Sequence, residues 1–143
     1  MTSWLLPDVN LWLALHAERH EHHGAAKAWF DALDEHRGLV FCRQTQLGLF
    51  RLLTSPVVMA DETLTQRQCW AIYQEWLAAG RAVLQPEPPE IEAAFRARTS
   101  VAEPATKTWT DSYLAAFAET ARLTLVTFDR ALAGKTKGAV LLG

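Results

Sequence analysis

The chain has 143 residues, of which half are hydrophobic and 21% are charged, so it predicts one compact globular domain and excludes disordered and fibrous proteins. Its 14 basic and 16 acidic residues give a net charge of −2, which excludes proteins that coat nucleic acid with a basic surface. Cys42 and Cys69 lack C-x-x-C spacing, and we expect them to be reduced thiols packed inside the protein. No apolar run approaches the roughly 20 residues of a membrane helix, and no leader sequence is evident, so we expect a soluble, cytoplasmic protein.

Strands and helices alternate along the predicted chain. The first half predicts a strand, two helices, a second strand and two more helices, at residues 3–7, 11–15, 25–35, 39–42, 44–53 and 65–79. The second half predicts a strand, a proline-rich turn, a helix, a loop, a helix and two strands, at 81–84, 86–89, 90–98, 99–107, 110–122, 123–128 and 139–142. Gly80 is the expected stop of the helix before it. The strands are nearly continuous apolar runs, which predicts an α/β fold whose mostly parallel sheet is covered by helices on both faces.

Three aspartates fall where ligands bind in such folds, beyond the carboxyl ends of the strands. Asp8 follows the first strand, Asp129 follows the strand at 123–128, and Asp111 opens the preceding helix. Clustered carboxylates repel one another unless a cation neutralises them, and ligands that are all oxygen select a hard ion such as Mg²⁺ or Mn²⁺. A metal-dependent hydrolase of phosphate esters is therefore the function class that follows most directly.

Each aspartate also has a purely structural interpretation. Asp8 can cap the helix after it, Asp129 can cap a short turn at 130–132, and Asp111 can lie in a first helical turn because negative charge is favoured there. Asp111 is the hardest to explain in this way, because helical spacing places it on the same apolar stripe as Leu114 and Ala118.

Four segments of the sequence resemble the PIN-domain ribonucleases, and most closely the VapC toxins of type II toxin–antitoxin systems. They are LPDVNLWLAL at 6–15, TQLGLFRLLT at 45–54, TWTDSYLAAFA at 108–118 and LVTFDR at 125–130, in the order of the family's blocks. The resemblance covers essentially all of 1–143 as a single PIN domain. It implies a three-layer α/β/α sandwich with a sheet of four to five strands.

The resemblance also implies site residues. Asp8, Asp111 and Asp129 match the family's metal-binding acids, and Thr127 matches a hydroxyl that supports the site, with Asn10 and Arg51 as further supporting residues. Many relatives carry a glutamate where this chain has Gly48, and there is no acid at Gln46 either. One firmly held Mg²⁺, with Mn²⁺ as the alternative and any second ion recruited by RNA phosphate, is the simpler expectation.

The function implied by the family is that of an Mg²⁺-dependent endoribonuclease that hydrolyses RNA phosphodiester bonds and is held inactive by a VapB-type antitoxin. A homodimer is implied as well. The alternative is a catalytically weak PIN module that binds RNA or a protein partner without cleavage, because the second-block acid is missing. A phosphotransfer site of the haloacid-dehalogenase or receiver type is disfavoured, since no suitably placed lysine and acidic pair accompany Asp8.

Two other groups of side chains remain open. His16 and His20 have the i,i+4 spacing of a helical metal pair, but a zinc-protease motif would need a histidine where Gly24 stands, so we expect a solvated helix end or a patch facing a partner. Arg51 has two interpretations, as a phosphate contact and as an internal partner of an active-site aspartate.

Overall fold

The computed structural model describes residues 4–143, so the Ser3 end of the first predicted strand lies outside the described residues. Five parallel strands form one sheet in the order β3-β2-β1-β4-β5. They are β1 (Leu5–Pro7), β2 (Leu39–Phe41), β3 (Ala82–Leu84), β4 (Thr124–Thr127) and β5 (Val140–Leu141). The predicted parallel sheet is confirmed.

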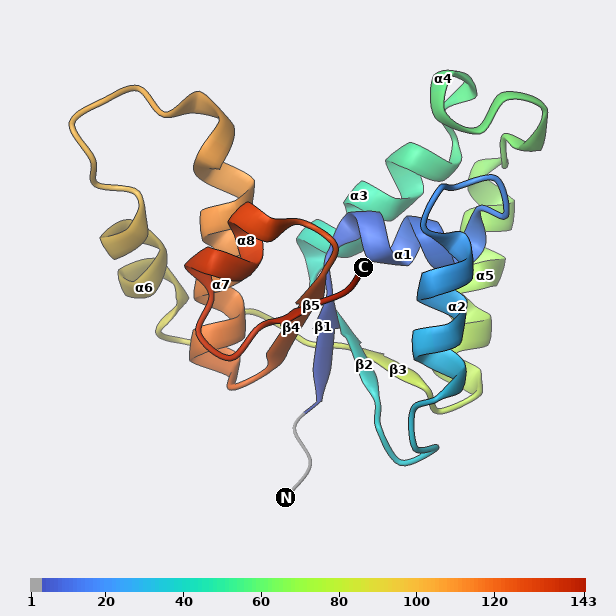
Figure 1. The fold of residues 1–143 in the computed structure, drawn as a ribbon, viewed down its shortest axis with the longest axis horizontal. Helices are drawn as coiled ribbons and strands as arrows, with labels where there is room; N and C mark the ends of the chain where they lie inside the picture. Colours follow the sequence, from blue (N-terminus) through green and yellow to red (C-terminus); the bar gives the residue numbers. More distant parts are fainter. Residues whose placement is uncertain (1–3) are drawn as a thin grey trace.

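Helices cover both faces of the sheet in a three-layer sandwich (Figure 1). One layer contains α1 (Val9–His16), α2 (His23–Asp31), α3 (Arg43–Leu53) and α5 (Gln66–Ala78), with α4 (Pro56–Met59) and the turn η1 (Ala60–Glu62) between the last two. The opposite layer contains α6 (Ile91–Arg98), α7 (Trp109–Ala121) and α8 (Arg130–Lys135), with the turn η2 (Thr106–Thr108) before α7. Within residues 4–143, no helix has the length and apolarity needed to cross a membrane.

The alternation of side chains along the central strands builds two cores. Leu5 and Phe41 point to the α1 side, where Trp12 and Leu49 are buried with them. The strand residues next to them in the sequence, such as Leu6 and Val40, point to the opposite face of the sheet. They form a second core there with Leu125 of β4, Phe117 of α7 and Leu132 of α8. Cys42 and Cys69 are buried free thiols, as expected. The two cores fix the central strands, and therefore the positions of the residues that follow them.

The predicted boundaries are wrong at three places. The helix expected over 25–35 begins at His23, where its imidazole bonds the Ala14 carbonyl (2.7 Å), and ends at Asp31. The expected loop over 99–107 contains the start of η2. The turn expected at 130–132 is the first part of α8, which is stabilised by a capping carboxylate and by the burial of Leu132.

Candidate active site

The candidate site lies where β1 and β4 end side by side. The two strands are parallel and in register from Leu5 opposite Thr124 to Pro7 opposite Val126. Asp8 continues this pairing, because its backbone N–H donates to the Val126 carbonyl (3.1 Å). The chain therefore leaves the sheet at the same level twice, once at Asp8 and once at Asp129.

Asp8 is buried and both of its carboxylate oxygens are bound. Oδ1 accepts the Leu11 N–H (2.8 Å) and caps α1, while Oδ2 accepts the hydroxyl of Thr127. Burial raises the pKa of Asp8 above its usual range, the hydrogen bonds from Thr127 and Leu11 oppose that rise, and the charges of Asp129 and Asp111 add to it. The carboxylate is therefore fixed in position and electrostatically strained.

The hydroxyl of Thr127 joins Asp8 to Asp129. It donates to Asp8 and accepts the backbone N–H of Asp129 (2.9 Å). Asp129 Oδ1 in turn accepts the N–H groups of Ala131 (2.8 Å) and Leu132 (3.2 Å), which caps α8. The capping interpretation is thus confirmed for both aspartates, and their shared hydroxyl brings them into one group.

Asp111 is coupled to this group through its charge. It is the third residue of α7 and is half-buried, and its carboxylate accepts no hydrogen bond from residues 4–143. Burial raises the pKa of Asp111, the charge of Asp129 raises it further, and the Lys135 ammonium lowers it. The three aspartates therefore share one electrostatic environment, although no hydrogen bond within residues 4–143 joins Asp111 to the other two.

The donor chemistry of this group fits a hard divalent cation. Carboxylate oxygens are the ligands that Mg²⁺ and Mn²⁺ prefer, and a cation would relieve the repulsion that raises the pKa values of Asp8 and Asp111. Among residues 4–143, however, no three His, Cys, Asp or Glu side chains lie close enough to enclose an ion. Asp8, Asp111 and Asp129 are thus candidate ligands that do not form a closed cage.

The missing second-block acid has a steric reason. A Cβ added at Gly48 would lie 2.7 Å from Cγ2 of Val9, so the glycine lets α3 pack directly on the first turn of α1. Gln46 is buried and accepts a hydrogen bond from the Arg43 guanidinium (2.6 Å). Neither position adds an acid to the site.

The remaining predicted supporting residues, Asn10 and Arg51, form no hydrogen bond or ion pair with the three aspartates among residues 4–143. Arg51 is exposed on α3, and its side chain forms no ion pair or hydrogen bond with residues 4–143, including the aspartates. Asn10 is exposed on α1, two residues after Asp8, and its Oδ1 is bound to Nε2 of His20 (2.9 Å).

The histidines do not form a metal pair. His16 Nδ1 donates to the Trp12 carbonyl (2.8 Å), and Nε2 accepts the indole N–H of Trp76 (2.8 Å). The ring is therefore neutral, and neither nitrogen is available to bind a metal ion. His20 instead bonds Asn10. The ring of His22, in the same segment between α1 and α2, is stacked on Phe128 at the end of β4. The sequence did not predict this contact.

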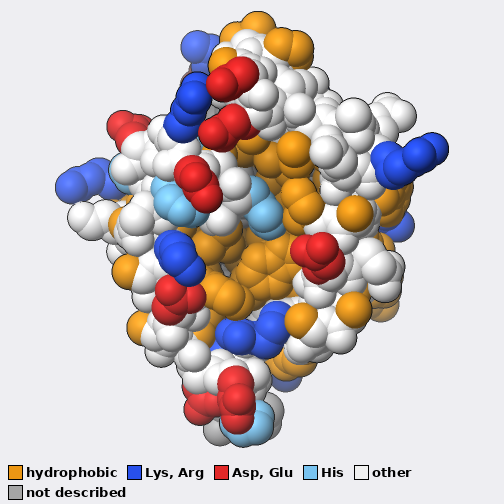
Figure 2. Space-filling model, turned by 90° about the vertical axis from the view of Figure 1, so that its right-hand side faces the viewer, with side chains coloured by type: hydrophobic (Ala, Val, Ile, Leu, Met, Phe, Trp, Pro, Cys, Tyr) orange, Lys and Arg blue, Asp and Glu red, His pale blue; other side chains and the backbone are white. Residues whose placement is uncertain are grey.

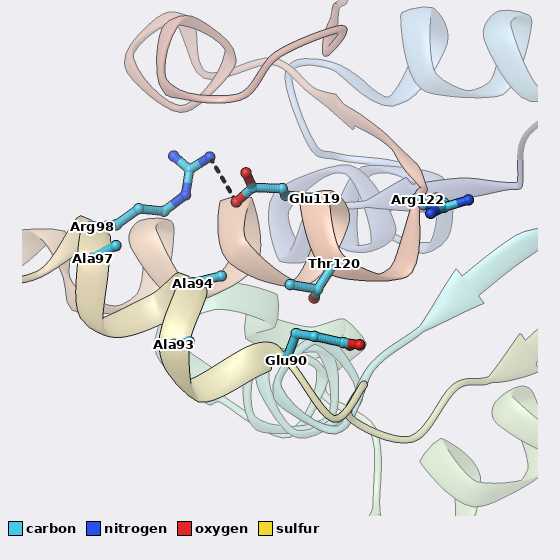
Figure 3. Close-up of a pocket in the computed structure, with 8 residues that line it drawn as sticks. All are labelled: Glu90, Ala93, Ala94, Ala97, Arg98, Glu119, Thr120 and Arg122. Carbon is cyan, nitrogen blue, oxygen red and sulfur yellow. Dashed lines mark ion pairs between the residues drawn. The ribbon is translucent and has the colours of Figure 1, made fainter.

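A broad open hollow lies between α6 and the end of α7 (Figure 3). Its volume is about 850 Å³, and its lining includes three alanines of α6 and the ion pair between Arg98 and Glu119 (3.5 Å). Asp111 lies in the opposite, first turn of α7. The hollow therefore presents a different chemistry from the carboxylate group.

Comparison with known proteins places the whole arrangement in one family. A model described as "PIN domain" matches residues 5–137. Ribonuclease VapC41 from two strains of Mycobacterium tuberculosis, CDC 1551 / Oshkosh and ATCC 25618 / H37Rv, is 45% identical over 131 residues, which are 89% of this chain and 90% of the relative.

Solved structures share the fold at lower identity. The FitAB complex bound to an IR36 DNA fragment has a TM-score of 0.68 at 19% identity, covering 96% of this chain and 93% of the other. FitAcB from Neisseria gonorrhoeae has a TM-score of 0.58 at 20% identity, covering 96% of each chain. PAE2754 from Pyrobaculum aerophilum has a TM-score of 0.57 at 21% identity, covering 96% and 83%.

Proposed function

We propose, from the membership of this chain in the PIN-domain family, that it is a metal-dependent endoribonuclease and the toxin of a type II toxin–antitoxin pair, with 1–143 as one PIN domain. One observation carries the proposal: the hydroxyl of Thr127 joins Asp8 and Asp129 at the ends of adjacent strands, with Asp111 electrostatically coupled to them. The 45% identity to a ribonuclease supports RNA as the substrate class.

The residues of the chain supply a rigid, negatively charged receptor. Asp8, Asp111 and Asp129 would hold Mg²⁺ or Mn²⁺, which when bound supplies charge neutralisation at the phosphate and a lowered pKa of water. Leu11 and Thr127 fix the two oxygens of Asp8, and the first N–H groups of α8 fix Oδ1 of Asp129. Asp8 and Asp129 are therefore held in position before the ion binds, which reduces the ordering cost.

Cleavage of RNA by aspartate variants tests the proposal. Asp8→Asn and Asp111→Asn should each abolish Mg²⁺-dependent cleavage with the fold intact by circular dichroism, because asparagine can replace Asp8 as a helix cap and Asp111 accepts no hydrogen bond from residues 4–143. Asp31→Asn, at an exposed aspartate paired with Lys27, is the matched control and should cleave normally. Full activity in the folded Asp8→Asn, Asp111→Asn double variant, or in excess EDTA, would overturn the proposal.

A binding module without cleavage is the second candidate, favoured by Gly48 in place of an acid. The pKa values of Asp8 and Asp111, raised in part by their acidic neighbours, argue against it, because a pure binder gains little from acids that repel one another and RNA. Growth arrest on expression separates the two candidates. Arrest by the wild type and by Asp8→Asn alike would support the binding module.

An apolar groove on the α2 and α5 side suits a protein partner. Figure 2 shows hydrophobic side chains gathered in a hollow of this face, with charged side chains around it. The groove has a volume of about 390 Å³ and is lined in part by Phe30, Trp76 and Arg81. The Arg81 guanidinium lies 4.5 Å from the centre of the Phe30 ring, and its buried Nε and Nη2 have no hydrogen-bond partner among the described residues.

The partner that fits this groove carries apolar side chains and one carboxylate. Two nitrogens of the half-buried Arg81 side chain lack a hydrogen-bond partner among the described residues, so a carboxylate that reaches them would be favoured. We take the partner to be the cognate antitoxin and the toxin to be a homodimer. Arg81→Met should raise the Kd of the complex with the cognate antitoxin, as measured by calorimetry. Unchanged affinity would exclude the groove as the docking site, and sedimentation equilibrium tests the dimer.

A further inference from the structure

Two histidines, His20 and His22, lie between α1 and α2. His20 Nδ1 accepts the backbone N–H of His22 (3.0 Å), so the ring proton is on Nε2 and is donated to Asn10 Oδ1 (2.9 Å). His23 anchors the start of α2 to the Ala14 carbonyl (2.7 Å). The segment is thereby fixed to α1, and Asn10 is only two residues from Asp8.

The ring of His22 is held against the strand end that carries the acids. It stacks on Phe128 with ring centres 4.1 Å apart and planes 9° from parallel. Phe128 stands between Thr127 and Asp129 in the sequence. The contact joins residues far apart in the sequence and fixes the imidazole beside the residue that directly precedes Asp129.

The nitrogens of His22 have no hydrogen bond within residues 4–143. The nearest acidic group is the exposed Glu21 carboxylate, 3.6 Å from Nε2, and 35% of the His22 side chain is exposed. His22 precedes α2 without capping it through its side chain. The ring is therefore positioned by stacking and by its backbone, while the exposed Glu21 carboxylate is the one polar contact of its nitrogens among the described residues.

We propose that His22 binds substrate RNA, with its imidazole N–H donating a hydrogen bond to a backbone oxygen, phosphate or ribose, next to the bond that is cut. The inference rests on the proposed ribonuclease function. Three aspartates present only negative charge and hydrogen-bond acceptors to RNA, so a donor at the edge of the site supplies what they lack. Stacking on Phe128 orients this donor at little entropic cost.

The experiment separates the polar edge of His22 from its packing. His22→Phe keeps a ring on Phe128 without nitrogens, His22→Ala removes both, and His22→Asn restores an N–H donor without the ring. His36→Phe, at an exposed histidine before β2, is the matched control. Binding of a labelled single-stranded RNA of randomised sequence is measured in Ca²⁺, and KM and kcat for its cleavage are measured in Mg²⁺, with melting temperatures for every variant.

The loss of one hydrogen bond to RNA predicts a rise of about tenfold in Kd and KM for His22→Phe and His22→Ala, a smaller rise for His22→Asn and none for His36→Phe. The melting temperature of the Phe variant should stay close to that of the wild type, because this variant keeps a ring on Phe128. Wild-type Kd and KM in His22→Phe would overturn the inference alone, since packing would then suffice. A wild-type protein that neither binds nor cleaves RNA would overturn both the inference and the proposed function.

Discussion

Replacing Thr127 by valine should destabilise the fold by about 2–4 kcal/mol, because one buried and one partly buried hydrogen bond disappear at nearly constant volume. The bond to the Asp8 carboxylate is charge-assisted and worth about 1.5–3 kcal/mol, and the bond from the Asp129 N–H is worth about 1 kcal/mol. Thr127→Ser keeps the hydroxyl, loses one methyl group and should cost about 1 kcal/mol. Urea unfolding followed by tryptophan fluorescence measures both variants.

The pH dependence makes the prediction sharper. The pKa of Asp8 in the folded protein is raised above its ordinary 3.8, so the folded chain binds this proton more tightly than the unfolded chain. Stability from this group is present below about 3.8 and is lost as pH rises through the raised pKa. Without the hydroxyl that lowers this pKa, the loss is larger, so the gap between the valine and serine variants should widen with pH. A gap below about 0.5 kcal/mol near pH 7, or one that is constant from acid to neutral pH, would refute the reasoning.

Three further measurements test other parts of the structure. Gly48→Ala should lower the free energy of unfolding by about 1–2 kcal/mol, because overpacking against Val9 outweighs the gain in helix propensity of about 1 kcal/mol. Adding Val9→Ala to the same chain should recover most of this loss, as measured by urea unfolding. Acidification below the ordinary histidine pKa of 6.5 should lower the melting temperature. Burial lowers the pKa of His16 in the folded protein, so the unfolded chain takes up the proton first as the pH falls. A His16→Gln variant with the same pH dependence of the melting temperature would contradict this. Mg²⁺ at about 100 times its Kd should stabilise the wild type by about 2.7 kcal/mol but leave Asp8→Asn unchanged, as thermal unfolding would show.

The sequence predicted the elements that have a clear hydrophobic periodicity or a residue that ends them. The stop after α5 is an example, because Gly80 adopts the left-handed conformation (φ 69°) that the position needs. Helix α8 was missed beyond its first residues because it has only six residues and contains Gly134, so its stability comes from the Asp129 cap and the burial of Leu132.

The candidate site divides in the same way. The positions of Asp8 and Asp129 follow from the apolar strands that precede them, and Asp111 was predicted from its place on the apolar stripe of its helix. The resemblance to a family then matched all three to metal-binding acids. The hydrogen bond from Thr127 to Asp8 and the stacking of His22 on Phe128 each join residues more than 100 positions apart. Such contacts depend on how two cores pack against one sheet, which local spacing does not encode. The groove residue Arg81 escaped notice for the same reason.

The double duty of Asp8 and Asp129 has a consequence for how this lineage can evolve. Each carboxylate caps the helix that follows its strand, so folding alone selects for a short polar residue there, whether or not RNA is cut. A descendant that gave up catalysis would still retain these two positions, as aspartate or asparagine. Asp111 accepts no hydrogen bond from residues 4–143 and does not cap its helix, so it would be free to drift. Loss of the acid at this third position is therefore the earliest mark by which a silent relative could be distinguished from an active one.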